Sequence, residues 1–282
     1  MKLLPVRPNL PFLRREARRL HRRVRGNDAT ALALARHFDR GFAAPTAAPE
    51  AFRLADAQRI VARGYGFGSW ARLASHVERA ATADRAPLDP ALARLLRSLH
   101  GESLEAVDRV RATGDRFDPR SVALQARAAR ALDAVFETHG WPTVSLVGPE
   151  PFAATFEIVG NAATQGLFNR RAMPRLAARV RRGEAPARWL AQLLDRADCL
   201  AGRPVRYGLV GDFDERGRFG TGHDVVDPAN LDVRRAGMGL EPIEAQRRRC
   251  AEEARARGED PSVDREAYEA ERLELGRRGG WR

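Results

Sequence analysis

The chain has almost no lysine and only two cysteines. Lys2 is the only lysine, and arginine supplies every other basic residue of the 49. Cys199 and Cys250 lie far apart and lack the spacing of metal ligands, so we expect two reduced thiols and neither a disulfide nor a zinc site. Heavy use of arginine and alanine is typical of a GC-rich bacterial genome, so the arginine content alone predicts no function.

Long apolar runs are also missing. No stretch of about 18 apolar residues occurs, and the opening residues MKLLPVRPNL are interrupted by proline and arginine too early for a secretory signal. We therefore expect a cytoplasmic protein without a membrane partner. With 282 residues and 44% apolar content, the chain can bury a substantial core in one or two domains.

Motifs of the familiar hydrolases and metalloproteases are absent. The chain has no Gly-x-Ser-x-Gly elbow, no His-Glu-x-x-His helix and no paired Cys-x-x-Cys motif. Asp212, Asp214 and Gly217 resemble part of a calcium loop, but Arg216 stands at a ligand position and no glutamate closes the pattern. The sequence therefore predicts no metal and no cofactor.

Helical periodicity is what the sequence does contain. Leu13, Ala17, Leu20 and Val24 recur at helical spacing among arginines, which predicts a basic amphipathic helix. Similar patterns of alanine, leucine and arginine continue to about residue 201. Strand character occurs only where RPVRYGLVGDF and GRFGTGHDVVD flank the turn DERG.

These patterns predict a mainly α fold: a helical N-terminal domain plus a larger helical domain with one β-hairpin. We expect the basic helical domain over residues 1–85, the larger domain over 86–245 with its hairpin near 205–226, and a charged helical tail over 246–282. Residues 1–85 contain 17 basic and 7 acidic side chains, most of the excess behind the net charge of +12. A nucleic acid or another acidic partner is therefore expected at that domain.

The segment RIVARGYGFGSWARLASHV, residues 59–77, has three interpretations. As a phosphate-binding glycine loop it lacks a preceding strand and a following lysine. As the turn of a DNA-binding helix pair it has Arg72 where an apolar residue should seat the second helix. We favour a tight corner, in which glycine permits the turn while Tyr65, Phe67 and Trp70 pack beneath it.

Two parts of the chain resemble bacterial families. LRREARRLHRRVRGNDATALALARHF and LADAQRIVARGYGFGSWARLASHVE, within about residues 11–79, resemble the helical segment that precedes ankyrin repeats, although no such repeat follows. HGWPTVSLVG, LLDRADCLAGRPVRYG, VDPANLDVRR and GMGLEP, within about 115–245, resemble the domain of unknown function 6624. The first resemblance implies a packing or adaptor module. The second implies a fold but no established activity.

The chain departs from the second family at its polar positions. Residues 160–163 read GNAA where that family usually has Gln-His-Ala-Asp, and residues 207–210 read YGLV where it has Tyr-Gly-Thr-Gln. Gln125 and Ala128 stand where a histidine and an asparagine are expected. If those polar groups form the family's site, the resemblance implies that most of the site is lost here.

The remaining polar residues suggest a pocket between the HGWP turn, the GNAATQ helix and the RYG strand. Guanidinium groups suit a carboxylate or phosphate, and an amide adds a donor and an acceptor. The alternative for these arginines is ion pairing with Asp195, Asp227 or Asp232. The candidate ligand-binding residues are Trp141, Asn161, Arg206, Tyr207, Arg234 and Arg235.

The same pocket has a catalytic interpretation. His139 or His223 would carry a proton, and Asp195 or Asp224 would orient the ring. The simpler interpretation of His139 is a helix end beside Trp141. The leading hypothesis is a binding protein for a small molecule or peptide with an anionic group. The alternatives are an enzyme of bacterial specialised metabolism that uses this pocket, and a nucleic-acid-binding regulator that uses residues 1–85.

Overall fold

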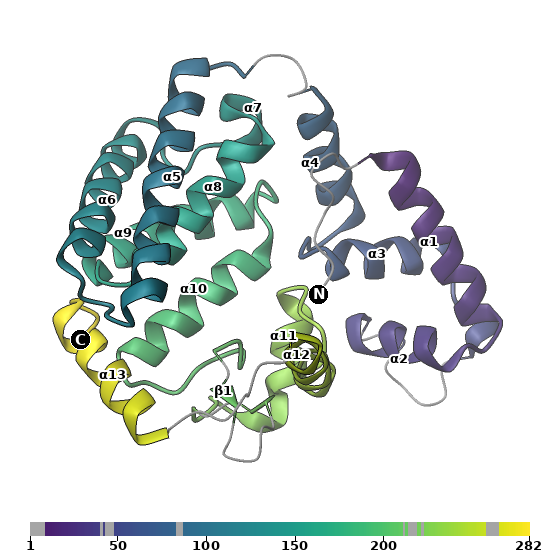
Figure 1. The fold of residues 1–282 in the computed structure, drawn as a ribbon. Coiled ribbons are helices and arrows are strands. Elements are labelled where there is room, and N and C mark those ends of the chain that lie inside the picture. Colours follow the sequence, from purple (N-terminus) through teal and green to yellow (C-terminus); the bar gives the residue numbers. More distant parts are fainter. Residues whose placement is uncertain are drawn as a thin grey trace.

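A computed structural model describes residues 9–39, 42, 48–82, 87–210, 212–213, 219–220, 223–257 and 265–282. Over these residues the fold is mainly helical, as the sequence predicts (Figure 1). The described residues contain 13 α-helices. None of the described helices has both the length and the apolar character that crossing a bilayer requires.

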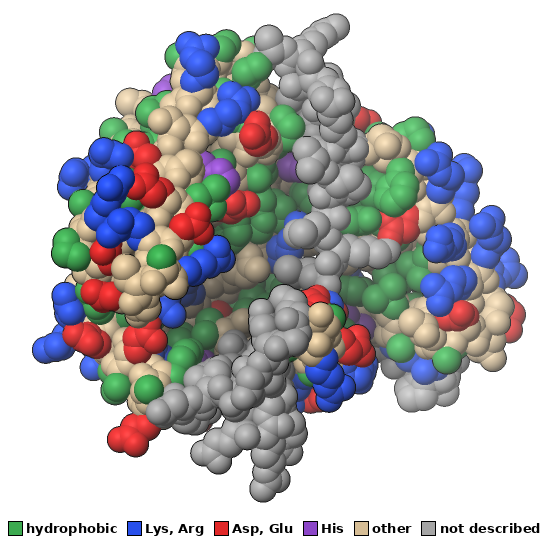
Figure 2. Space-filling view, in the orientation of Figure 1, with side chains coloured by type: hydrophobic (Ala, Val, Ile, Leu, Met, Phe, Trp, Pro, Cys, Tyr) green, Lys and Arg blue, Asp and Glu red, His purple; other side chains and the backbone are tan. Residues whose placement is uncertain are grey.

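Four helices form the N-terminal part of the molecule: α1 (Leu10–Arg25), α2 (Ala29–Phe38), α3 (Leu54–Gly64) and α4 (Trp70–Thr82). Asn9 starts α1 by accepting a hydrogen bond from the Phe12 amide at 2.8 Å, and Asp28 starts α2 in the same way. The predicted apolar face of α1 is confirmed, because Leu13, Ala17, Leu20 and Val24 are all buried. The arginines of α1 lie on the opposite face, along the edge of the molecule (Figure 2).

The glycine corner between α3 and α4 is a packing turn. Gly66 has a φ of 85°, and Tyr65 and Phe67 are buried in the same core cluster as the apolar face of α1. The Gly66 carbonyl accepts a hydrogen bond from the Ala187 amide at 2.9 Å. The corner therefore also joins the N-terminal helices to the larger part of the chain.

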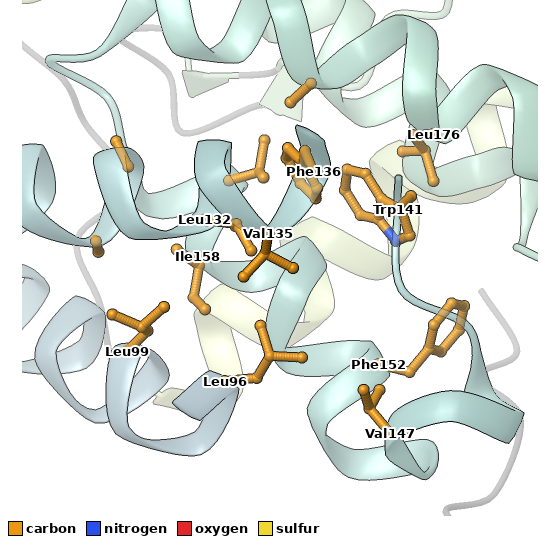
Figure 3. Close-up of a cluster of buried hydrophobic side chains, with 14 of the residues drawn as sticks. Leu96, Leu99, Leu132, Val135, Phe136, Trp141, Val147, Phe152, Ile158 and Leu176 are labelled. Carbon is orange, nitrogen blue, oxygen red and sulfur yellow. The ribbon is translucent and has the colours of Figure 1, made fainter. Parts of the chain in front are cut away.

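Six further helices form the larger part: α5 (Pro90–Thr113), α6 (Pro119–His139), α7 (Val144–Val147), α8 (Pro149–Asn161), α9 (Gly166–Arg181) and α10 (Ala187–Leu200). Their shared core contains Leu96, Leu132, Ile158 and Leu176 (Figure 3). Trp141 closes one end of this core, where its ring stacks on Phe136 with centroids 5.2 Å apart.

Two short strands follow α10, and after them come η3 (Pro228–Asn230) and α11 (Leu231–Gly237). The hairpin predicted near residues 205–226 is not confirmed as an extended element. The described residues show only β1 (Asp212–Phe213) paired antiparallel with β2 (Phe219–Gly220), and an isolated parallel bridge between Val205 and Val225. The predicted turn DERG lies outside the described residues.

Two last helices, α12 (Ile243–Arg257) and α13 (Arg265–Arg278), carry the many charges that the sequence shows. The end of the chain is nevertheless packed rather than solvated. Trp281 is buried and donates its indole N–H to the Ala163 carbonyl at 2.7 Å, while the Gly166 amide donates to Gly279 at 2.7 Å. Residues 265–282 therefore cover the start of α9 and one face of α10.

Candidate functional site

Asp195 holds the loop that follows α10. Its side chain is fully buried, and its two carboxylate oxygens accept hydrogen bonds from the amides of Arg206, Tyr207 and Leu209 at 2.8–2.9 Å. Burial raises the pKa of this carboxyl, and the three backbone donors act against that rise. These amides bond to a side chain instead of a second strand, which is the physical reason why the predicted hairpin arm is not extended here. None of these contacts orients His139 or His223.

The structure brings together four of the predicted ligand-binding residues, Arg206, Tyr207, Arg234 and Arg235, but the protein itself uses the three guanidinium groups. Arg235 is fully buried. It donates to the Tyr207 carbonyl, to the Glu241 carbonyl at 2.8 Å and to Gln246 Oε1 at 2.7 Å. Burial lowers the pKa of Arg235.

Arg234 and Arg206 are occupied in the same way. Arg234 donates to the Arg206 carbonyl at 3.1 Å and to the Asp227 carbonyl at 3.0 Å. Arg206 forms an ion pair with Asp198 at 2.9 Å. These arginines therefore fix the loop around Tyr207. Of the ion pairs expected as the alternative, Arg234–Asp227 forms at 3.5 Å and Arg235–Asp232 at 3.9 Å, whereas the Asp198 partner of Arg206 was not predicted.

Asn161 and Trp141 lie elsewhere. The side-chain amide of Asn161 donates to Ser103 Oγ on α5 at 3.1 Å. On α6, Gln125 Oε1 accepts from the backbone amide of Thr164 at 3.0 Å. The GNAATQ segment thus packs beside the first half of α6. Trp141, in contrast, lies two residues beyond His139, which is the last residue of α6. Fourteen residues of helix separate Gln125 from His139, or roughly 21 Å. Among the described residues the three segments therefore do not meet at one pocket, and His139 lies exposed at a helix end.

A cavity of about 150 Å³ lies between α10 and α13. Its polar lining comes from Arg116, Arg196, Cys199, Tyr268, Glu271 and Arg272. Of the residues predicted from the sequence, only His223 lies beside this cavity: its Nε2 is 3.2 Å from Tyr268 Oη and 3.4 Å from Cys199 Sγ. The sequence did not single out the arginines of the lining.

Two of the three cavity arginines are paired with carboxylates. Arg116 pairs with Glu271, and Arg272 pairs with Glu269 at 2.5 Å and also donates to the Cys199 carbonyl at 2.6 Å. Arg196 differs, because its guanidinium donates to the Gly160 carbonyl and pairs with no carboxylate among the described residues. Burial, helped by the nearby charge of Arg116, lowers the pKa of Arg196 to about 10, so it remains a cation at neutral pH.

Cys199 lines the same cavity as a neutral thiol. Burial raises its pKa to about 11, so the thiolate needed for nucleophilic attack or metal binding is scarce at neutral pH. Within the described part of the chain, no group of three or more His, Cys, Asp or Glu side chains is arranged to hold a metal ion. The cavity is therefore suited to holding an anion and poorly suited to cysteine chemistry.

Comparisons of the chain with protein-family models, with curated proteins and with solved structures find no match. The two family resemblances accordingly stay predictions, and the geometry of the cavity is the basis on which a function can be inferred.

Proposed function

We propose that this protein binds a small anionic molecule in the cavity between α10 and α13. The observation that carries the proposal is Arg196, a cation in the cavity wall with no carboxylate partner among the described residues. A charge withdrawn from water is costly unless an opposite charge or several hydrogen bonds compensate it. A bound anion would supply that compensation. The ligand class expected from the sequence is kept, and its site moves to other residues.

The charge at the cavity favours a ligand with one negative group. Glu271 and Glu269 neutralise Arg116 and Arg272, which leaves the charge of Arg196 unbalanced among the described residues around the cavity. A guanidinium group presents parallel N–H donors that match the two oxygens of a carboxylate. The hydroxyl of Tyr268, which lies 3.2 Å from His223 Nε2, adds a polar group at the same wall.

The size of the cavity limits the ligand. A cavity of about 150 Å³ resembles engineered apolar cavities of about that volume, which hold a molecule the size of benzene. Sites for drug-sized ligands are larger, about 300–1,000 Å³. We therefore expect a short carboxylic acid or a comparable small anion, and not the peptide that the sequence left open.

A catalytic function with His223 as proton carrier is the alternative, and the specific observation in its favour is the His223–Tyr268 contact at the cavity. In that case His223→Ala would abolish turnover of the bound molecule and leave the fold intact. His139 is exposed at the end of α6, away from the cavity lining, so His139→Ala should have no effect on such a reaction.

Calorimetry and thermal unfolding of the full chain with a panel of short monocarboxylates and inorganic phosphate test the proposal. We expect at least one of them to bind and to raise Tm. Arg196→Gln should weaken that binding about 10- to 100-fold, since a hydrogen bond to a charged group contributes about 1.5–3 kcal/mol.

The matched control is Arg203→Gln, which removes an exposed arginine that pairs with Asp198 at 2.9 Å and does not line the cavity. It should bind as tightly as the native chain. The proposal is wrong if no small anion binds, or if Arg196→Gln and Arg203→Gln behave alike.

A further inference from the structure

The outward face of α1 carries a dense strip of unpaired positive charge. Of the seven exposed arginines of α1, Arg23 pairs with Asp28 at 2.9 Å, and within the described residues no side-chain hydrogen bond or ion pair engages the other six. Several arginines on other helices are neutralised: Arg120 pairs with Glu105, and Arg127 with Glu102. The strip, which we call the α1 arginine strip, consists of Arg14, Arg15, Arg18, Arg19, Arg22 and Arg25.

Helix geometry arranges this strip opposite the core. At about 100° per residue, its six side chains cover ~140° of the helix surface, and the buried residues Leu13 and Leu20 lie on the other side. From Arg14 to Arg25 the strip runs about 17 Å along the axis. α1 forms the outer edge of the molecule, where Figure 2 shows the basic side chains in the open.

We propose that the α1 arginine strip binds the phosphate backbone of duplex DNA. A duplex carries one negative charge per ~1.7 Å of its axis, so a strip of this length meets a comparable density of phosphates. Guanidinium groups donate two parallel hydrogen bonds to a phosphate. The helix with its side chains is also about as wide as the major groove, roughly 12 Å, so arginines on both flanks of the strip reach the bordering strands.

A membrane surface is a weaker match for the same charges. Helices that lie on membranes insert an apolar face beneath their basic residues. The apolar face of α1 is buried in the protein's own core, and the large apolar side chain that α1 exposes is Phe12 in its first turn. Acidic vesicles are therefore expected to compete poorly with a duplex.

The contacts that we propose are made to phosphates, which carry no sequence information, so we infer binding that is independent of sequence. Fluorescence anisotropy of a labelled 20-bp duplex with the full chain, across 50–200 mM salt, tests this. Six phosphate contacts predict a slope of about −5 in log K against log salt, or about a 10³-fold loss of affinity over that range.

The decisive variant replaces the middle of the strip: Arg15→Gln, Arg18→Gln and Arg22→Gln together. Its slope should be shallower by about 2.7, because each lost phosphate contact removes about 0.9. The control, Arg94→Gln with Arg120→Gln and Arg127→Gln, removes the same charge from exposed positions on α5 and α6 and should keep the native slope. A second variant, Arg18→Glu, changes a single exposed side chain. It should also weaken duplex binding.

Three results would overturn the proposal. The first is no duplex binding by the native chain at 50 mM salt. The second is an equal loss in the strip variant and in its control, which would indicate net charge and not the strip. The third is tighter binding to vesicles of anionic lipid than to the duplex. Arg196→Gln should leave duplex binding unchanged, so this inference can fail or hold independently of the cavity.

Discussion

Asp118 connects two helices through one carboxylate. It accepts from Arg109 Nε at 2.7 Å and from the Ser121 amide at 2.8 Å, so it ties α5 to the first turn of α6. The Arg109 guanidinium, and after it the Ser121 amide, hold the pKa of this carboxyl at about 2, below its ordinary value of 3.8. The unfolded chain therefore takes up a proton at a higher pH than the folded chain does.

This difference predicts a stability contribution that is complete above about pH 5 and is lost as the pH falls from there toward 2. Asp118→Asn should lower the free energy of unfolding at pH 7 and reduce its decline between about pH 5 and 2. Urea unfolding over that range measures both effects. As a control, Asp108→Asn removes a carboxylate that pairs with Arg111 in an ion pair whose two side chains are exposed. It should leave the free energy of unfolding at pH 7 and its decline at low pH nearly unchanged. Equal behaviour of the two variants would contradict the prediction.

At this scale the sequence identifies polar residues but not their partners. Arg206, Tyr207, Arg234 and Arg235 were predicted to converge, and they do lie together. The guanidinium groups of the three arginines are nevertheless satisfied internally, as in the bond from Arg235 to Gln246. Whether a buried guanidinium is satisfied depends on residues from other elements, which a pattern along one segment does not reveal.

Gly166 allows a close contact between α9 and the end of the chain. A Cβ at this position would lie 2.7 Å from the carbonyl oxygens of Gly279 and Gly280. Gly166→Ala should therefore push the C-terminal segment away and destabilise the fold by about 1–3 kcal/mol. Thermal and urea unfolding measure the loss.

Gly101 is the matched control within a helix, because a Cβ there would meet nothing within 4 Å. Gly101→Ala should raise the free energy of unfolding by up to ~1 kcal/mol, since alanine favours α5. If Gly166→Ala were as stable as Gly101→Ala, the contact between α9 and residues 279–280 would not be a structural requirement.

Elements differed in how far the sequence predicted them. The buried face of α1 follows from the local periodicity of Leu13, Ala17, Leu20 and Val24, and it was predicted residue by residue. The packing of α13 was not, because its charged sequence indicates a solvated helix and Trp281 alone signals burial. A lone aromatic residue does not name its partner, which is the Ala163 carbonyl over a hundred residues away.

Gly239, which follows α11, lies where the chain packs closely against the end of α3 and the glycine corner. Its φ is 72°, and a Cβ there would overlap the Arg63 carbonyl and Gly66 Cα. Gly239→Ala should loosen the N-terminal helices from the rest of the molecule, so amide hydrogen exchange should accelerate in α1–α4 more than in α5–α9.

Gly237→Ala is the control, because its Cβ would have nothing within 4 Å. It should leave the exchange pattern unchanged. Uniform acceleration in Gly239→Ala would mean that the molecule opens as a single unit.

The cavity is a property of the whole molecule, and for that reason it escaped prediction. Its lining joins Arg116 between α5 and α6, Arg196 on α10 and Arg272 on α13. Each of these arginines has an unremarkable neighbourhood in the sequence. Only the packing of the last helix on α10 brings them together, and that contact has no local signature.

α10 connects the glycine corner of the N-terminal helices with the cavity. At its first residues the Ala187 amide and the Arg188 guanidinium each donate to the glycine corner at 2.9 Å, and at its last turn Arg196 and Cys199 line the cavity. α10, about 21 Å long, thus spans the distance between the glycine corner and the cavity. If an anion in the cavity shifts α10 and thereby changes the affinity of the α1 arginine strip for a duplex, then the duplex must change the affinity of the cavity for the anion by the same factor.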